Sequence, residues 1–202
     1  MIPNDPVIID NFYRDPDSVR NFCIKQHFYK RPGKYPGLRT KPINDIDQSF
    51  FHYFVSLMCQ HLFPHSKLQW DVRTLFQYAT EQYRGGWIHT DDVYYNMAGV
   101  VYLTPDAPKT CGTSIYNPTS SRIIPYSAPT DPFPSGYDLD SHEKEQIEYN
   151  SQFTLKQSID NVYNRFICYK TTEFHAQDGF FGVDKHSARM IQIFFARIDF
   201  VN

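Results

Sequence analysis

The segment WIHTDD, at residues 87–92, contains a histidine two positions before an aspartate. Imidazole nitrogens and carboxylate oxygens both bind divalent transition metals. On an extended strand, side chains at positions i and i+2 point to the same face, so we expect His89 and Asp91 to face one point and Asp92 to face away. A second histidine in the later segment TEFHAQDGFFG would complete a set of two imidazoles and one carboxylate. Such a set leaves positions open on a metal such as Fe(II).

These side chains must be positioned by the elements around them. Asp15-Pro16-Asp17 provides a helix cap, a first-turn proline and an acidic first turn, and apolar spacing predicts a second helix over residues 45–62. From residue 68 the apolar period approaches two, which predicts strands over residues 71–79, 88–91, 98–104, 113–116, 165–170, 173–175 and 189–200. Helices followed by short strands are typical of an α+β fold with a mainly antiparallel core, and we expect the N-terminal helices to pack on one sheet.

We expect residues 1–202 to form one domain. In this division, residues 1–67 are a helical scaffold, residues 68–116 and 165–202 are the β core, and residues 117–164 are an insertion. The insertion has many prolines, a weak strand signal and an acidic second half. Its composition is compatible with a lid that carries a short helix near residues 141–150, and equally with a surface excursion.

Composition and charge exclude several classes of protein. The formal net charge is −2, so the chain lacks the excess of basic residues that is typical of a nucleic-acid-binding protein. The longest apolar run, residues 97–103, is too short to span a bilayer, and the N-terminus has no signal-peptide pattern. Four scattered cysteines without a C-x-x-C pair favour free thiols in a reducing compartment. We therefore expect a cytoplasmic protein without a nucleic-acid or membrane partner.

Three stretches of the chain resemble one enzyme family. FQYATEQYRGGWIHTDD, AGVVYLTPDAPKTCGTSIY and FHAQDGFFGVDKHSARMIQIFFA are similar to the Fe(II)/2-oxoglutarate-dependent dioxygenase superfamily, and most to its prolyl-4-hydroxylase-like group. The resemblance extends over about residues 70–116 and 165–197. It implies a double-stranded β-helix, which is a distorted jelly roll. It also implies Fe(II) as cofactor, with 2-oxoglutarate and O₂ as cosubstrates.

By this resemblance, His89 and Asp91 match the first two iron ligands, and two histidines compete for the third position. His186 lies three residues before Arg189, which would put the two side chains on opposite faces of an extended strand. His175 lies farther upstream, and the turn through Asp178, Gly179 and Gly182 can return the chain beside it. We therefore expect His175 to be the ligand and His186 to be a turn or surface residue.

The resemblance also implies residues that bind 2-oxoglutarate. Arg189 matches the basic residue of the last strand, and its guanidinium can bind a carboxylate through two parallel hydrogen bonds. Ser187 shares its strand face, and Tyr78 matches a tyrosine that hydrogen-bonds the same carboxylate. Tyr102 is expected either to line the pocket or to belong to the core. Thr113 matches a family threonine and could equally be structural.

The function implied is an oxygenase that hydroxylates a small-molecule or peptidyl substrate and releases succinate and CO₂. The presence of Asp91 disfavours halogenation, because related halogenating enzymes lack the metal carboxylate. Two alternatives stay open: a cupin-like jelly-roll module that binds a metal or ligand without turnover, and an interaction protein that has lost the chemistry. A basic loop with Lys30, Arg31, Lys34, Arg39 and Lys41 would favour an acidic substrate if it borders the site, and it could also be a solvated face.

Overall fold

The computed structural model describes residues 2–30, 35–83, 85–123 and 139–201. The strands are β1 Val7–Ile9, β2 Leu38–Arg39, β3 Leu68–Ala79, β4 Met97–Tyr102, β5 Thr113–Pro118, β6 Phe153–Ile159, β7 Phe166–Tyr169, β8 Phe174–Gln177 and β9 Arg189–Phe200. The α-helices are α1 Pro16–Ile24, α2 Gln48–Leu62 and α3 Leu139–Asn150, and short 3-10 helices lie at Ile43–Asp45 and Glu81–Tyr83.

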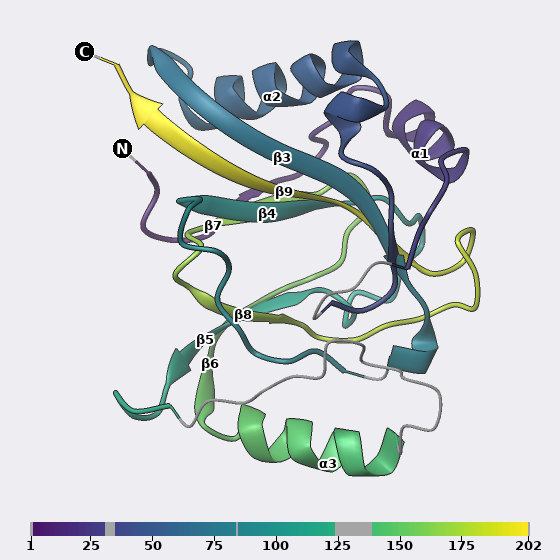
Figure 1. Cartoon of the computed structure of the whole chain (residues 1–202), viewed down its shortest axis with the longest axis vertical. Helices are drawn as coiled ribbons and strands as arrows, with labels where there is room; N and C mark the ends of the chain where they lie inside the picture. Colours follow the sequence, from purple (N-terminus) through teal and green to yellow (C-terminus); the bar gives the residue numbers. More distant parts are fainter. Residues whose placement is uncertain (1, 31–34, 84, 124–138, 202) are drawn as a thin grey trace.

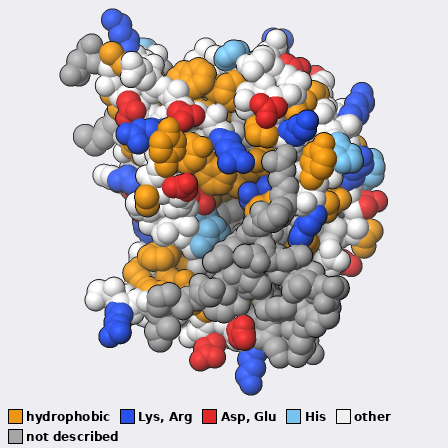
Figure 2. Space-filling view, viewed as in Figure 1, with side chains coloured by type: hydrophobic (Ala, Val, Ile, Leu, Met, Phe, Trp, Pro, Cys, Tyr) orange, Lys and Arg blue, Asp and Glu red, His pale blue; other side chains and the backbone are white. Residues whose placement is uncertain are grey.

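The strands form two antiparallel sheets in a mixed α/β fold. The larger has the order β1-β7-β4-β9-β3-β2 and the smaller the order β6-β5-β8. Helices α1 and α2 lie against the outer face of the larger sheet, and α3 lies beyond the smaller sheet (Figure 1). Acidic and basic side chains are interspersed with hydrophobic ones over the described part of the face in Figure 2.

The long strand β9 shows how the larger sheet separates two apolar layers. Met190, Phe194 and Ile198 belong to the core cluster that includes residues of α1 and α2. Ile191 belongs to a second cluster, which includes residues of β4 and β7 and Ile115 and Ile159 of the smaller sheet. Strand alternation therefore gives β9 a helix-facing side and a side that faces the other sheet.

Both N-terminal helices begin at the caps that their sequences provide. The Asp15 side chain accepts a hydrogen bond of 3.0 Å from the amide of Ser18, which fixes the start of α1. Asp47 caps α2 in the same way through the amide of Phe50. The prediction of two helices is confirmed, although α2 begins at Gln48 because residues 43–45 form a 3-10 turn.

Strand β6 lies inside the range predicted to be an insertion. Residues 153–159 pair with β5 and form one edge of the smaller sheet, so this part of residues 117–164 belongs to a sheet. Its interior is mostly exposed, with only Phe153 and Ile159 buried at its ends, which explains its weak strand pattern. Helix α3 covers the expected helix at 141–150, and residues 124–138 lie outside the described part of the chain.

The strand predicted at residues 88–91 is wrong as a regular element. His89 forms a single isolated bridge with His175, in which each backbone amide donates to the other residue's carbonyl oxygen, at 3.0 and 2.9 Å. The short strands β1 and β2 were not predicted. No helix in the described ranges is long and apolar enough to cross a membrane.

Candidate metal centre and adjoining pocket

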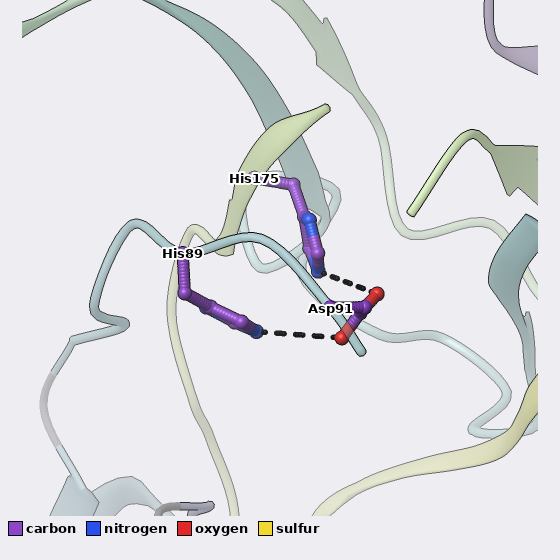
Figure 3. Close-up of side chains that lie close together, drawn as sticks. All are labelled: His89, Asp91 and His175. Atoms are coloured by element: carbon purple, nitrogen blue, oxygen red, sulfur yellow. Dashed lines mark ion pairs between the residues drawn. The ribbon is translucent and has the colours of Figure 1, made fainter. Parts of the chain in front are cut away.

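The side chains of His89, Asp91 and His175 point toward one another (Figure 3), and His175 lies on strand β8. Nε2 of His175 lies 3.5 Å from Oδ2 of Asp91, and Nε2 of His89 lies 3.9 Å from Oδ1. One ligand atom from each residue lies within 4.8 Å of the others, and this is the only such group of three among the described residues. The i, i+2 spacing of His89 and Asp91 thus brings both to one point without a regular strand.

The backbone around His89 and Asp91 is held by a few specific contacts. Besides the bridge to His175, the amide of Asp91 donates to the carbonyl oxygen of Thr171 at 2.9 Å. Asn150, at the end of α3, accepts from the amide of Ile88 at 3.1 Å and donates to the carbonyl oxygen of Gly86 at 2.9 Å. These bonds fix the segment that carries two of the three converging side chains.

Gly86 lies in close contact with strand β8. A Cβ atom at this position would lie 2.5 Å from the carbonyl oxygen of Gln177, closer than real Cβ contacts allow. The absence of a side chain therefore lets the segment approach β8 near His175.

The other ring nitrogen of each histidine fixes its orientation. Nδ1 of His89 lies 2.7 Å from the carbonyl oxygen of Trp87, and Nδ1 of His175 lies 3.0 Å from that of Glu173. A carbonyl oxygen can only accept, so Nδ1 carries the proton in both rings. Nε2 of each ring then faces Asp91, and in a neutral ring this nitrogen carries the lone pair, which is the arrangement of metal-binding histidines held by an outer hydrogen bond.

Burial shifts the pKa values of His175 and Asp91 and so affects their charge. Burial, reinforced by nearby His89, lowers the pKa of His175 to about 3, so this imidazole is neutral near pH 7. The 3.5 Å approach to Asp91 is therefore a contact between a neutral ring and a carboxyl group rather than an ion pair. Burial raises the pKa of Asp91, and the nearby His89 and Arg39 oppose that rise. Two nitrogen lone pairs and a carboxylate directed at one point suit a divalent transition metal.

A pocket of about 120 Å³ adjoins these three residues. Its apolar wall includes Val100, Ile191, Ile193 and Phe195 from β4 and β9, and its charged lining residues other than the three are Arg39 and Arg189, counted over the described residues. The pocket therefore joins a potential metal site to two guanidinium groups.

Arg189 is 4% exposed and starts β9. Its Nε donates to the carbonyl oxygen of Cys111 at 3.0 Å, and Nη2 donates to the carbonyl oxygen of Gly112 at 3.2 Å and to Oγ1 of Thr113 at 3.4 Å. Among the residues that the structure describes, no carboxylate lies within 4.0 Å of it; Asp178 acts on it only from a longer distance. A buried cation without a carboxylate favours binding of an anion from outside.

Tyr102 lies beside Arg189 in the core between the sheets. It is fully buried, its hydroxyl donates to Oγ1 of Thr113 at 2.8 Å, and its ring centre lies 5.5 Å from the Arg189 guanidinium carbon. Thr113 lines the pocket, whereas Tyr102 is not part of the lining. Of the two expectations for Tyr102, the structure favours the core.

The structure does not bring Tyr78, Ser187 or His186 to the pocket. Tyr78 packs on the helix side of β3, edge-on to Phe28, because the pocket side is occupied by its neighbour Gln77. Ser187 is exposed and bonds Asp184 within a turn, through Oγ to Oδ1 at 2.9 Å. His186 is also exposed in that turn, so it is His175 that lies beside Asp91.

The pocket and supporting residues that sequence reasoning missed include Arg39, Gln77 and Asn150. Arg39 was visible only as one charge in a basic loop, of which residues 31–34 lie outside the described ranges. Gln77 was one position away from the tyrosine chosen instead. Asn150 carried no signal, because its role arises only where the end of α3 meets residues 86–88.

Solved structures of 2-oxoglutarate oxygenases share this fold. HygX from Streptomyces hygroscopicus, solved with nickel, 2-oxoglutarate and hygromycin B, aligns with a TM-score of 0.60 at 9% identity, over 96% of this chain and 83% of HygX. A Trichoplax adhaerens prolyl hydroxylase, in complex with a hypoxia inducible factor peptide fragment, gives 0.54 at 11%, over 96% and 84%. A Pseudomonas putida prolyl-4-hydroxylase gives 0.53 at 11%, over 96% and 92%. The resemblance inferred from the sequence is confirmed at the level of the fold.

Sequence comparison gives a different kind of result. No curated protein matches the chain. One family model matches residues 4–179, nearly the whole chain. The chain therefore belongs to the Family of unknown function (DUF6445).

Proposed function

We propose that this chain is an Fe(II)- and 2-oxoglutarate-dependent oxygenase of the hydroxylase type, formed by a single domain. The proposed architecture is a double-stranded β-helix in which the two antiparallel sheets face each other. Support comes from the strand orders and from the similarity to solved oxygenases over nearly the whole chain.

The observation that carries the proposal is the set of three candidate metal ligands beside a buried guanidinium that has no carboxylate partner among the described residues. His89, Asp91 and His175 would hold Fe(II) through Nε2, a carboxylate oxygen and Nε2. Arg189, on the first residue of β9, would bind the distal carboxylate of 2-oxoglutarate, with Thr113 as a second hydrogen-bonding group. Fe(II) at this site would supply the O₂ activation that amino-acid side chains cannot.

The chain's own residues would position and shield the reactants. The two Nδ1–H groups keep both imidazoles aimed at the metal, and Tyr102 and Thr113 support the guanidinium of Arg189. Val100, Tyr169 and Ile191 give the pocket apolar walls that limit access of water. The overall reaction converts substrate R–H, O₂ and 2-oxoglutarate into R–OH, succinate and CO₂.

The experiment that tests the proposal is an anaerobic titration of the full chain with Fe(II) and 2-oxoglutarate. A 2-oxo acid chelated to Fe(II) gives a visible charge-transfer absorption, and we expect this band with one iron per chain. Asp91→Ala should abolish the band. Asp92→Ala should keep it, because the Asp92 carboxylate instead accepts the amide of Tyr94 at 3.0 Å. Absence of the band in the wild-type protein would refute the oxygenase assignment.

Turnover separates this proposal from a cupin-like binding module. An oxygenase consumes 2-oxoglutarate and forms succinate in an iron-dependent reaction, even slowly without substrate, whereas a binding module forms none. We further propose a cytoplasmic location, since Cys23, Cys59, Cys111 and Cys168 are free thiols.

A further inference from the structure

Arg39, on the edge strand β2 of the larger sheet, places a second guanidinium in the pocket. It lies on β2, opposite Gln77 of β3, and it lines the pocket together with the metal-binding candidates. Its backbone is fixed from both sides, because it also exchanges amide-to-carbonyl hydrogen bonds with Tyr29 at 2.8 and 3.1 Å. The Cα position of Arg39 is therefore well defined.

The side chain of Arg39 is also held in one orientation. Its guanidinium carbon lies 3.5 Å from the ring centre of Tyr35, a stacking distance. Its Nε donates to Oε1 of Gln77 at 2.6 Å, and Gln77 is fixed in turn by donating to the carbonyl oxygen of Pro36 at 2.9 Å. These contacts use one face and one nitrogen of the guanidinium.

Among the described residues, nothing binds the two terminal nitrogens of Arg39. Within the described ranges they form no hydrogen bond, and no carboxylate lies within 4.0 Å of them. Partial burial disfavours the charge and lowers the pKa of Arg39 to about 10, while Asp91 acts in the opposite direction. The group is therefore a cation at neutral pH, preorganised for a partner with two acceptor oxygens.

The balance of charge in the pocket also points to an anion. Arg39 and Arg189 are its cationic side chains and Asp91 its acidic one, taken over the lining residues that the structure describes. The charges of Fe(II) and the 2-oxoglutarate dianion would cancel, so one positive charge of the pocket would stay uncompensated with both bound. The overall charge does not explain such a preference, because the formal net charge is −2 and acidic and basic side chains are interspersed on the described part of the face in Figure 2.

We propose that Arg39 binds the carboxylate of the substrate, and that the substrate is a small carboxylic acid with an apolar body. This inference rests on the proposed oxygenase function. A monoanion matches the single uncompensated charge, and the fork of the guanidinium matches a carboxylate. Ile193 and Phe195 line the pocket on the strand that also carries Arg189, and they offer an apolar surface to the rest of the substrate.

The test uses the full chain loaded with Zn(II) and 2-oxoglutarate, a state that cannot turn over. The probes are 3-phenylpropionate and its neutral isostere 3-phenylpropanamide, whose dissociation constants are measured by ligand-observed NMR. We expect the carboxylate to bind the wild-type protein at least tenfold more tightly than the amide. Arg39→Gln should reduce that preference to within twofold, while the dissociation constant of 2-oxoglutarate stays within twofold.

Arg73→Gln is the matched control. Arg73 is an exposed arginine on β3 whose charge acts on Arg39, and it does not line the pocket. Removal of the Arg73 charge should leave the preference for the carboxylate probe over the amide intact. If Arg73→Gln loses as much of that preference as Arg39→Gln, the effect is a general one of nearby positive charge, and the proposal is overturned. Equal binding of the two probes to the wild-type protein would also overturn it.

Two outcomes separate this inference from the proposed function. If Arg39→Gln weakens 2-oxoglutarate binding tenfold or more, Arg39 is a cosubstrate anchor and the inference is wrong, although the oxygenase assignment stands. If the wild-type protein fails to form the Fe(II)–2-oxoglutarate absorption band, the oxygenase assignment is wrong, and the role of Arg39 toward an oxygenase substrate is wrong with it.

Discussion

Arg189 and the His89–Asp91 pair face the same pocket, but the backbones that carry them are held in different ways. Arg189 begins a strand of 12 residues that pairs along its whole length with β3, from Ala79–Arg189 to Leu68–Phe200. Segment 85–92 has no regular strand and is held by the bridge to His175, by the Asp91–Thr171 bond and by Asn150. The Arg189 side of the pocket therefore shares the stability of the sheet, whereas the side with the candidate metal ligands depends on a few separate bonds.

The largest expected effect is on the metal-binding side. His175→Ala removes one of three converging ligand atoms, so its Fe(II) affinity should fall by more than the roughly 100-fold that loss of an outer hydrogen-bond partner causes. His186→Ala should change the affinity by no more than a few-fold, because that histidine is exposed in a turn. Anaerobic Fe(II) titration measures both, and a stronger loss in His186→Ala would contradict the assignment.

The second prediction concerns Arg189, on the side of the pocket that the larger sheet holds. Arg189→Gln should weaken 2-oxoglutarate binding on the order of 30-fold or more, because truncating a buried charge-assisted pair costs about 2–5 kcal/mol. Its Fe(II) affinity should stay nearly unchanged, since Arg189 contacts none of the three converging side chains. Tyr78→Phe serves as control and should leave both affinities unchanged, because Tyr78 packs on the helix side of β3. Titration of the charge-transfer band reports the 2-oxoglutarate affinity. An equal loss of that affinity in Arg189→Gln and Tyr78→Phe would show that Tyr78 also binds the cosubstrate.

Two asparagines allow the locally held segment 85–92 to be compared with the body of the fold away from the pocket. Asn150 bonds the amide of Ile88 and the carbonyl oxygen of Gly86, and Asn164 bonds the amide and the carbonyl oxygen of Tyr13, at 2.9 and 2.8 Å. Asn150→Ala should lower metal affinity about 10- to 100-fold with little change in global stability, since it acts on a locally held segment.

Asn164→Ala should do the reverse. Loss of two buried hydrogen bonds, at a residue with a positive φ of 63°, should lower the free energy of unfolding by about 1–3 kcal/mol while metal affinity is kept. Urea denaturation and metal titration of both variants measure the contrast. If Asn150→Ala lowers global stability as much as Asn164→Ala, segment 85–92 unfolds together with the rest of the fold and is not held locally.

The sequence predicted the metal-binding candidates better than it predicted the pocket walls. His89 and Asp91 depend on a short local spacing, and a single bridge was enough to keep it extended. Strand β9 was predicted with its observed limits because its alternation is long and regular. For β3, residues 74–77 are all buried, so alternation could not tell which face bordered the pocket, and Tyr78 was chosen over Gln77.

Other residues were beyond the reach of sequence patterns. Strand β6 is an exposed sheet edge, and its apolar residues stand only at its ends. Arg39 acquires its place from the pairing of a two-residue strand with β3, and no periodicity can be read from two residues. Ser187 was expected on the last strand but belongs to the turn that precedes it, where Asp184 binds it.

The central position of β9 also bears on how the protein folds. This strand comes last among the strands along the chain, yet it lies between β4 and β3, so without it the larger sheet consists of two separate pieces, β1-β7-β4 and β3-β2. Its pairings join residues far apart in sequence, such as Leu68 and Phe200. Such contacts form only after long loops have closed, so the chain loses conformational entropy before the contacts stabilise it. This order slows folding. We therefore expect the larger sheet to become continuous only when β9 pairs with β4 and β3, and the Arg189 end of the pocket to form together with that pairing.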